Sequence, residues 1–317
     1  MFSLRQFLLS VFVFQSTQLL AEASIQVIED EISITLLKEE RLLLRYLKQP
    51  SLKAKMHASH YSRTGYLHPI YSPSGKIITG DYANDHPHQH GLFFAWTKSN
   101  FRGNQTEFWN QHKKLGDVRF HRFLGKEEDE GSLSLKFEQV FTTGKDSDEP
   151  ILIEKWKINV PKKEQPYFQF DLISTQRCAT KDPLVIEVNH YGGMAIRGND
   201  QWLKLDSQGI PMGRMLTSEG KNQENGNHSR PRWVAMHGPV DDQECGVVMM
   251  NHPDNFRFPQ WARLHPSKPY FVFAPMVKEP FAIEPNKSYV SKFRFLTYDG
   301  IPDRDVIEES WKEWIRN

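Results

Sequence analysis

The stretch Tyr289-Val-Ser-Lys-Phe-Arg-Phe-Leu296 mixes β-branched and aromatic residues with polar ones, as a half-buried strand does. Turns rich in Gly, Pro, Asp and Asn, such as Ser72-Pro-Ser-Gly75, separate it from other strand-like segments. Five further segments of this kind lie at residues 32–36, 42–46, 133–137, 155–160 and 167–172. Because these short strands do not alternate with helices, the sequence predicts a mainly β protein, a large antiparallel β-sandwich rather than a parallel α/β sheet.

The sequence predicts one helix, at the C-terminus. After Pro302 and Asp303 the apolar residues fall at helical spacing on one face, at Val306, Ile307, Trp311, Trp314 and Ile315. The segment 218–230 is polar and rich in turn residues, which predicts a long surface loop. No repeat or linker divides the sequence, so we expect a single β-sandwich domain over residues 24–317.

The N-terminal segment has the pattern of an export signal. Arg5 precedes the apolar residues 7–14, and Leu20-Ala-Glu-Ala23 ends in the A-x-A pattern of a cleavage site. The apolar stretch is too short to span a bilayer, and no later segment is apolar enough to do so. We therefore expect a signal peptide over residues 1–23 and a periplasmic or secreted mature chain. An uncleaved N-terminal anchor is the alternative.

Charge and cysteine content narrow the class further. Lys and Arg (40) balance Asp and Glu (39), which argues against a nucleic-acid partner because binding to phosphates requires a basic face. Cys178 and Cys245 have no metal-binding spacing, and we expect both to be buried small hydrophobes, with a disulfide as the alternative. The sequence has no G-x-S-x-G, P-loop, G-x-G-x-x-G or H-E-x-x-H motif, which disfavours serine hydrolases, nucleotide-dependent enzymes and zincins.

The first group of candidate site residues is a run of histidines at alternate positions. In an extended strand, alternate side chains leave the backbone on the same side, as expected for His86, His88 and His90. Imidazole is an acid or base at neutral pH and a common metal ligand, so a divalent metal held here with Asp85 is an alternative. Pro87 interrupts the ladder and favours a strand end or a bulge. Another alternative is that these histidines have no functional role and only form hydrogen bonds with the backbone of a nearby loop.

A second group lies at residues 187–198. If this segment is extended, Glu187 and Tyr191 share one face and His190 lies on the other. Arg197 presents a planar fork of donors suited to a carboxylate or to vicinal hydroxyls. An ordinary ion pair between Arg197 and Asp200 is the alternative.

A third group follows the apolar run at residues 246–250. Prolines fix this loop, which would preorganise His252, Asn255 and Arg257 at the lip of a site. Asn255 could instead bond to its own backbone in a turn. His68, just before a turn signal, is a further candidate.

At these motifs the sequence resembles a bacterial family of unknown function labelled PmoA-like, or "methane oxygenase PmoA". The matching pieces, in order, are Tyr66-Leu-His-Pro69, Ser72-Pro-Ser-Gly75, Asp85-His-Pro-His-Gln-His-Gly91, Tyr191-Gly-Gly, Arg197-Gly, Arg232-Trp233, Asn251-His-Pro-Asp-Asn255, Arg257, Pro259 and Asp299-Gly300. This chain has Gln89 where relatives often show a third consecutive histidine. The resemblance implies a galactose-mutarotase-like sandwich that accompanies carbohydrate-oxidising and keto-sugar-cleaving enzymes, the partners it suggests.

These observations together predict an exported carbohydrate-active enzyme that uses histidine acid/base chemistry for epimerisation, elimination or glycoside cleavage. The candidate catalytic residues are His86, His90, His252 and His190, with His88 also able to move protons. The candidate substrate-binding residues are His68, Asp85, His88, Glu187, Tyr191, Arg197, Asn255 and Arg257. No cofactor motif is found. The alternatives are a metal-dependent enzyme or metal-binding protein that uses His86, His88 and His90, and a non-catalytic glycan-binding module.

Overall fold

The structure is a computed structural model that describes residues 23–144, 147 and 149–316. The expected signal peptide, except for Ala23, lies outside these residues and stays a prediction. No helix in the described ranges is long and apolar enough to cross a membrane.

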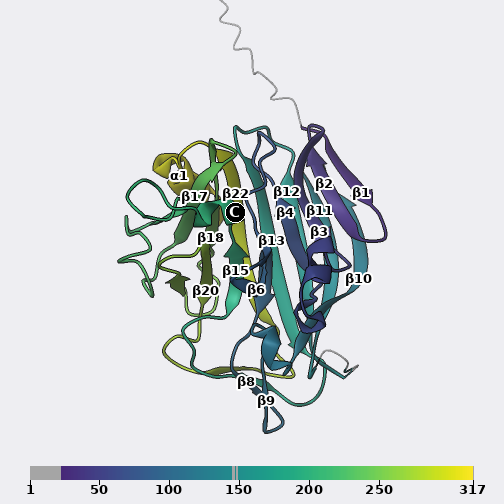
Figure 1. Cartoon of the computed structure of the whole chain (residues 1–317). Coiled ribbons are helices and arrows are strands. Elements are labelled where there is room, and N and C mark those ends of the chain that lie inside the picture. The colour runs from purple at the N-terminus through teal and green to yellow at the C-terminus, as the bar shows by residue number, and fades with distance from the viewer. Residues whose placement is uncertain (1–22, 145–146, 148, 317) are drawn as a thin grey trace, which may run out of the picture.

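Two eight-stranded sheets form the body of the molecule, and all their paired strands are antiparallel (Figure 1). The first sheet contains, in spatial order, β1 (Ile25–Glu29), β2 (Ser33–Lys38), β3 (Arg41–Leu47), β4 (Tyr66–Ile70), β7 (Leu92–Ala95), β15 (Gly193–Arg197), β20 (Tyr270–Ala274) and β19 (Trp261–Leu264). The second contains β10 (Asp117–Glu128), β11 (Ser132–Thr142), β12 (Pro150–Pro161), β13 (Phe168–Cys178), β22 (Tyr289–Asp299), β18 (Gln243–Asn251), β17 (Trp233–Val240) and β16 (Arg214–Thr217). The predicted large antiparallel β-sandwich is confirmed.

Smaller elements complete the fold. A four-stranded sheet contains β21 (Phe281–Ile283), β14 (Leu184–Ile186), β8 (Ser99–Phe101) and β9 (Asn104–Thr106). A two-stranded hairpin pairs β5 (Asp81–Ala83) with β6 (His86–His90). The helices are α1 (Arg304–Arg316) and the short 3₁₀ turns η1 (Leu52–Met56), η2 (Ser59–Tyr61), η3 (Gln111–Lys113) and η4 (Asp200–Leu203).

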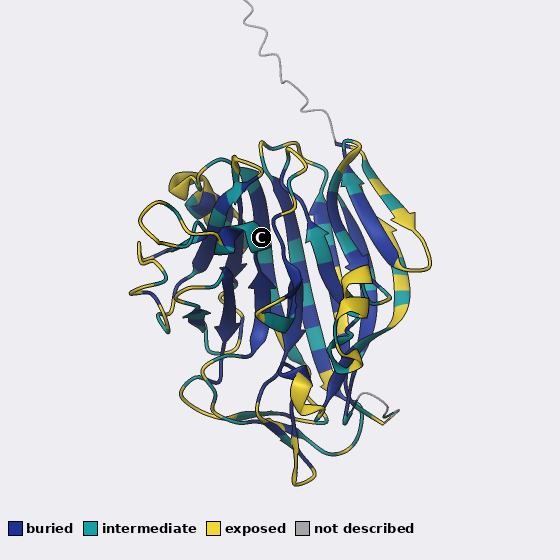
Figure 2. Cartoon of the chain, in the orientation of Figure 1, coloured by how far each residue is buried: buried dark blue, intermediate teal, exposed yellow. Residues whose placement is uncertain are grey.

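The core lies between the two large sheets, whose central strands are buried while loops and edges are exposed (Figure 2). The contact between the sheets includes Tyr46 of β3, which stacks on Phe137 of β11 at 3.8 Å and meets Trp156 of β12 edge-on. The outer face of the second sheet is covered in turn by α1, where Ile307 packs against Trp233. Burial on both faces explains why the β18 sequence is continuously apolar.

Most of the predicted elements are confirmed. The six predicted strand segments coincide with β2, β3, β11, β12, β13 and β22, and the predicted C-terminal helix is α1. Cys178 and Cys245 are buried and unpaired. The prediction of extended structure is wrong for residues 187–192, which form the irregular connection from β14 to β15. The strand end or bulge expected at Pro87 is confirmed, because β6 begins one residue earlier, at His86, and the β5–β6 register shifts between the Ala83–His86 and Asp81–His90 pairs.

Gly91 allows the histidine-bearing strand to lie against β4. Its φ is 23°, and a Cβ at this position would lie 2.0 Å from the carbonyl oxygen of Leu67. We predict that Gly91→Ala lowers the free energy of unfolding by about 1–3 kcal/mol, because the backbones must separate. Gly131→Ala, where the nearest neighbouring atom is 3.9 Å away, should change it by less than about 0.5 kcal/mol. Chemical denaturation measures both, and an equal effect of the two variants would contradict the prediction.

Candidate functional site

The β5–β6 hairpin is attached to the end of β15 by two backbone hydrogen bonds, and a third joins its own two ends. The amide of Gly80 donates to the Arg197 carbonyl at 2.9 Å, and the amide of Arg197 donates to the Gly91 carbonyl at 2.7 Å. The amide of Gly91 then donates to the Gly80 carbonyl at 2.8 Å, so the two ends of the hairpin are also joined. This backbone attachment holds the histidine run beside Arg197, on the first sheet (Figure 1).

Four histidines from three segments form what we call the histidine cluster: His86, His88, His112 and His265. The ring centroid of His86 lies 5.5 Å from that of His88 and 6.0 Å from that of His265. The His88 ring lies 6.1 Å from that of His112, which belongs to η3. Tyr270 at the start of β20 closes the group, with its ring 5.1 Å from His265.

Asp85 is the charged centre beside the cluster. Its carboxylate lies 2.9 Å from the ammonium of Lys268 and 3.2 Å from the guanidinium of Arg197. The Nδ1 atom of His86 is also 3.2 Å away, which is ion-pair range but without hydrogen-bond geometry. Partial burial opposes ionisation of Asp85, but the hydrogen bond from Lys268 and the charge of Arg197 outweigh it and lower its pKa to about 2.

Arg197 is fully buried, and its side chain holds the site together. Its guanidinium donates to Gln89 at 2.9 Å and to Asp85 at 3.2 Å, and Asp200 lies 3.5 Å away. The two terminal nitrogens of the predicted fork therefore donate to the protein's own acceptors, the ion pair with Asp200 is present, and the buried Nε has no partner among the described residues. Ligand contact by Arg197 would require one of these partners to move.

Two cluster histidines are held in the neutral form. Burial, with the positive charges around it, lowers the pKa of His88 to about 3, and His88 has no hydrogen-bond partner among the described residues. Burial, with the charges of Arg263 and His86, lowers the pKa of His265 to about 4. The amide of Ser267 donates to Nδ1 of His265 at 3.2 Å, so the proton of the neutral ring is on Nε2. His88 thus offers a free base, and His265 offers a donor.

The second predicted group joins the cluster through aromatic rings. The Trp109 ring lies 5.3 Å from that of Tyr191 and 6.5 Å from that of Tyr270. The Tyr191 hydroxyl pairs with the Asn110 amide, and the His190 ring lies 4.6 Å from the Tyr191 ring. Glu187 is not on a strand, and its backbone amide donates to the Lys98 carbonyl at 2.9 Å.

His90 belongs to a buried pair beneath the cluster rather than to its exposed part. Its Nδ1 lies 2.9 Å from Asp81, and its Nε2 lies 3.0 Å from the side-chain oxygen of Gln111. The Asp81 carboxylate also accepts from Tyr66 at 3.0 Å. Both ring nitrogens of His90 are therefore engaged, and the contact with Gln111 anchors η3, which carries His112.

His68 on β4 is half-buried and senses the charge of Asp81. Its Nδ1 is 3.0 Å from the Thr79 hydroxyl, and burial lowers its pKa to about 4 against the opposing charge of Asp81. These contacts make His68 part of the support beneath the cluster.

The third predicted group does not meet the histidine cluster. His252 packs its ring against Trp314 of α1 at 4.7 Å, and Asn255 bonds to Asn251 and to the Lys292 backbone. Arg257 donates to the carbonyls of three residues after β20: Pro275, Glu279 and Pro280. These three side chains therefore fix their own loop, and none of their described contacts reaches the histidine cluster.

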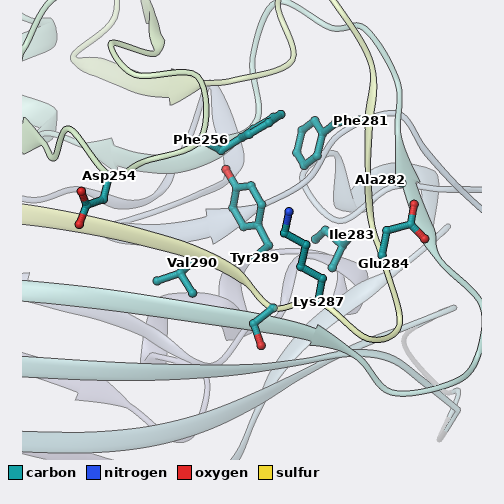
Figure 3. A pocket seen from close by; sticks show the side chains of 10 residues that line it. Asp254, Phe256, Phe281, Ala282, Ile283, Glu284, Lys287, Tyr289 and Val290 are labelled. Carbon is teal, nitrogen blue, oxygen red and sulfur yellow. The ribbon is translucent and has the colours of Figure 1, made fainter.

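Two pockets lie near these groups, and only one adjoins the histidine cluster. It has a volume of about 480 Å³ and shares Asp85 and Lys268 with the cluster; its other lining residues are Asn84, Asp200, Leu203, Leu205, Pro211 and Ser267. A second pocket, of about 390 Å³, lies by the third group and is walled by Phe256, Phe281 and Tyr289 (Figure 3).

The described residues do not provide a metal site. No group of three or more His, Cys, Asp or Glu among residues 23–144, 147 and 149–316 has an arrangement that could hold an ion. The donors of His90 are already engaged, and Asp85 faces Lys268 and Arg197. The residues of the histidine run thus do not fit the metal alternative.

The residues that sequence analysis missed are His112, Arg263, His265, Lys268 and Tyr270. Four of them come from one short stretch, Arg263-Leu-His-Pro-Ser-Lys-Pro-Tyr270, whose density of polar and cationic groups around two prolines was a usable signal. His112 stands alone in the sequence, and only the hydrogen bond between Gln111 and His90 brings it to the cluster.

The fold and the site together define a β-sandwich protein with a histidine-rich surface site beside a polar pocket. The chain belongs to a family of unknown function, DUF6807, which matches residues 33–312. No curated protein matches it.

Several solved structures are distantly similar. A heparan sulfate lyase HepC mutant from Pedobacter heparinus aligns over 88% of this chain with 10% identity and a TM-score of 0.42, and this chain spans only 37% of the lyase. YeaD from Salmonella typhimurium, described as a mutarotase, aligns over 88% of this chain and 92% of its own length, with 8% identity and a TM-score of 0.36. Likenesses this distant leave the function to be argued from the site itself.

Asp81 should contribute strongly to stability. We predict that Asp81→Asn lowers the free energy of unfolding at pH 7 by about 3–5 kcal/mol, because the substitution removes the carboxylate charge that pairs with buried His90. Although burial opposes ionisation, the hydrogen bond and charge of His90 lower the pKa of Asp81 below its usual 3.8. The contribution is thus present above pH 3.8 and is lost as the pH falls through the lower, folded-state value. Denaturation at pH 7 and pH 3 tests this.

The matched control is exposed Asp242, and Asp242→Asn should change the stability by less than about 0.5 kcal/mol. A loss in Asp81→Asn that is the same at both pH values would contradict a role for the Asp81 charge.

Elemental analysis tests the metal alternative directly. We predict substoichiometric metal in the purified protein never exposed to chelator, and no difference in the His86→Ala/His90→Ala variant, because the ring nitrogens of His90 are engaged. Near-stoichiometric metal that disappears in the double variant would contradict this prediction.

Proposed function

We propose that this protein is a carbohydrate-active enzyme that moves a proton at a carbon next to a carbonyl or carboxylate group, by epimerisation or elimination. The observation that carries the proposal is the pair of neutral imidazoles, His88 and His265, on either side of His86. A neutral imidazole with a free nitrogen can accept a proton, and one with a fixed N–H can donate one.

In the proposed reaction, His88 removes the proton from the carbon, and the C–H electron pair becomes an enediolate. The Nε2–H of His265 donates a hydrogen bond to the oxygen on which the charge develops. Delivery of a proton from a water molecule to the opposite face of the carbon, with release of the first proton from His88 to solvent, gives the epimer. In elimination, the enediolate electrons form the new C–C double bond, the C–O bond of the neighbouring carbon breaks, and protonated His88 passes its proton to the leaving oxygen.

The carboxylates near the cluster favour this chemistry over hydrolysis of a glycoside. A glycosidase of the usual kind needs one carboxyl group with a raised pKa to protonate the leaving oxygen. The pKa of Asp85 is instead lowered to about 2, because its hydrogen bond with Lys268 and the charge of Arg197 outweigh partial burial. Asp200 is paired with Arg197 and Lys53. Histidines are therefore the better candidates for proton transfer.

The adjoining pocket supports a sugar as the substrate. Its polar side chains (Asn84, Asp85, Asp200, Ser267, Lys268) suit hydroxyl groups, and its apolar side chains (Leu203, Leu205, Pro211) suit the C–H face of a ring. The proposal includes export, which the N-terminal segment predicts. It also includes keto-sugar-processing enzymes as partners, which the PmoA-like resemblance implies.

Hydrogen–deuterium exchange tests the proposal. We predict that the wild-type protein exchanges a carbon-bound proton of at least one member of a panel of aldoses, keto-sugars and uronates in D₂O, as followed by NMR. His88→Gln should lower the rate by about 10²-fold or more. Because the base must be neutral and the pKa of His88 is about 3, the rate should hold from pH 8 to pH 5 and fall below about pH 4.

The matched control is His121→Gln, which changes an exposed histidine on β10 and should leave the rate unchanged. An exchange rate in His88→Gln equal to that of the wild-type protein would contradict the role of His88 as the base. Saturable sugar binding with no exchange for any member of the panel would favour the glycan-binding alternative.

A further inference from the structure

Arg263 is a cation at the histidine cluster without a counter-ion. It lies on β19, its guanidinium donates to the Leu264 carbonyl at 3.0 Å, and its charge lowers the pKa of nearby Tyr270 against the larger effect of burial. Its Nε is buried without a hydrogen-bond partner. Within the described residues, no carboxylate lies in ion-pair range of Arg263, whereas Arg197 and Lys268 both contact Asp85.

The groups that face Arg263 do not compensate its charge. Burial and the charges of Arg263 and His228 lower the pKa of His190, and His265 is likewise held neutral. Burial raises the pKa of Tyr270, so its hydroxyl stays protonated. The neighbouring groups His190, His265 and Tyr270 are therefore uncharged, and none of them offsets the charge of the half-buried guanidinium.

A half-buried cation keeps only part of its hydration, and a bound anion would restore the lost interactions. A guanidinium presents parallel N–H donors that match the two oxygens of a carboxylate. The Tyr270 ring contacts both His265, at 5.1 Å, and His86, at 6.3 Å, so an anion on Arg263 would lie at the edge of the histidine cluster.

We infer that Arg263 binds the carboxylate of an acidic sugar, such as a uronate or an aldonate. The inference rests on the proposed function, because the acidic sugar is the substrate of the same site. The inference also narrows the proposed reaction to proton transfer at a carbon next to a carboxylate rather than next to a carbonyl. The carbon next to the bound carboxylate carries the proton that His88 removes, and Arg263 balances the charge that forms on the carboxylate oxygens as the enediolate develops.

Binding measurements test this inference without requiring turnover. The probes are D-glucuronate, D-galacturonate, D-gluconate, the neutral sugars D-glucose and D-galactose, and D-glucose 6-sulfate, each titrated by NMR against the full-length protein. We expect at least one sugar acid to bind at least about tenfold more tightly than its neutral parent. Arg263→Gln should weaken binding of that acid about 10- to 100-fold and leave binding of the neutral sugars unchanged.

Arg263→Lys and Arg177→Gln are the matched variants. The lysine keeps the charge but loses the fork, so it should retain only part of the preference for the acid. Arg177 is an exposed arginine on β13 of the other sheet, and its replacement should retain the whole preference. As a check on folding, the imidazole NMR titrations should show His190 and His265 becoming more basic in Arg263→Gln, because a positive charge near them is removed.

Three results would overturn the inference: no sugar acid binds better than its neutral parent, only the sulfated sugar does, or the preference for the acid survives in Arg263→Gln. These outcomes are separable from failure of the proposed function. A protein that binds sugar acids through Arg263 but exchanges no proton would refute the proton-transfer chemistry alone. One that exchanges protons only on neutral sugars would refute the carboxylate site alone.

Discussion

The guanidinium of Arg197 is the buried charge on which the site depends. A charge removed from water is tolerated only where hydrogen-bond acceptors and opposite charges surround it. Here these come from Gln89 on β6, from Asp85 in the β5–β6 turn and from Asp200 on η4. Satisfying one side chain of β15 therefore fixes the position of the hairpin and, with it, of His86 and His88.

A second consequence is the way charge is distributed across the site. Asp85 and Asp200 are committed to Arg197, Lys268 and Lys53, so they cannot neutralise anything further along the first sheet. Burial, together with the cations around them, keeps His88 and His265 uncharged. What remains is a set of neutral proton acceptors and donors beside one uncompensated cation, an arrangement suited to an anionic substrate.

The third predicted group illustrates the limit of motif analysis. Polar side chains in a proline-fixed loop are equally suited to holding a ligand and to holding the loop. His252, Asn255 and Arg257 do the second, since their partners are Trp314, Asn251 and backbone carbonyls. Arg197 gives the same lesson, because its two terminal nitrogens donate to Gln89, Asp85 and Asp200 of the protein itself. The sequence shows which polar side chains are present, but not whether each one bonds to the protein itself or to a ligand.

The sequence by itself determined the strands, the C-terminal helix and the histidine run, because alternation, helical spacing and turn residues act between near neighbours in the chain. It could not join residue 112 or residues 263–270 to that run. The pairing of β20 with β15 and with β19, and the hydrogen bond of Gln111 to His90, bring them together. Ionisation was likewise decided by the tertiary structure, since desolvation and neighbouring charges, not residue type, keep His88 and His265 neutral and leave Arg263 without a partner.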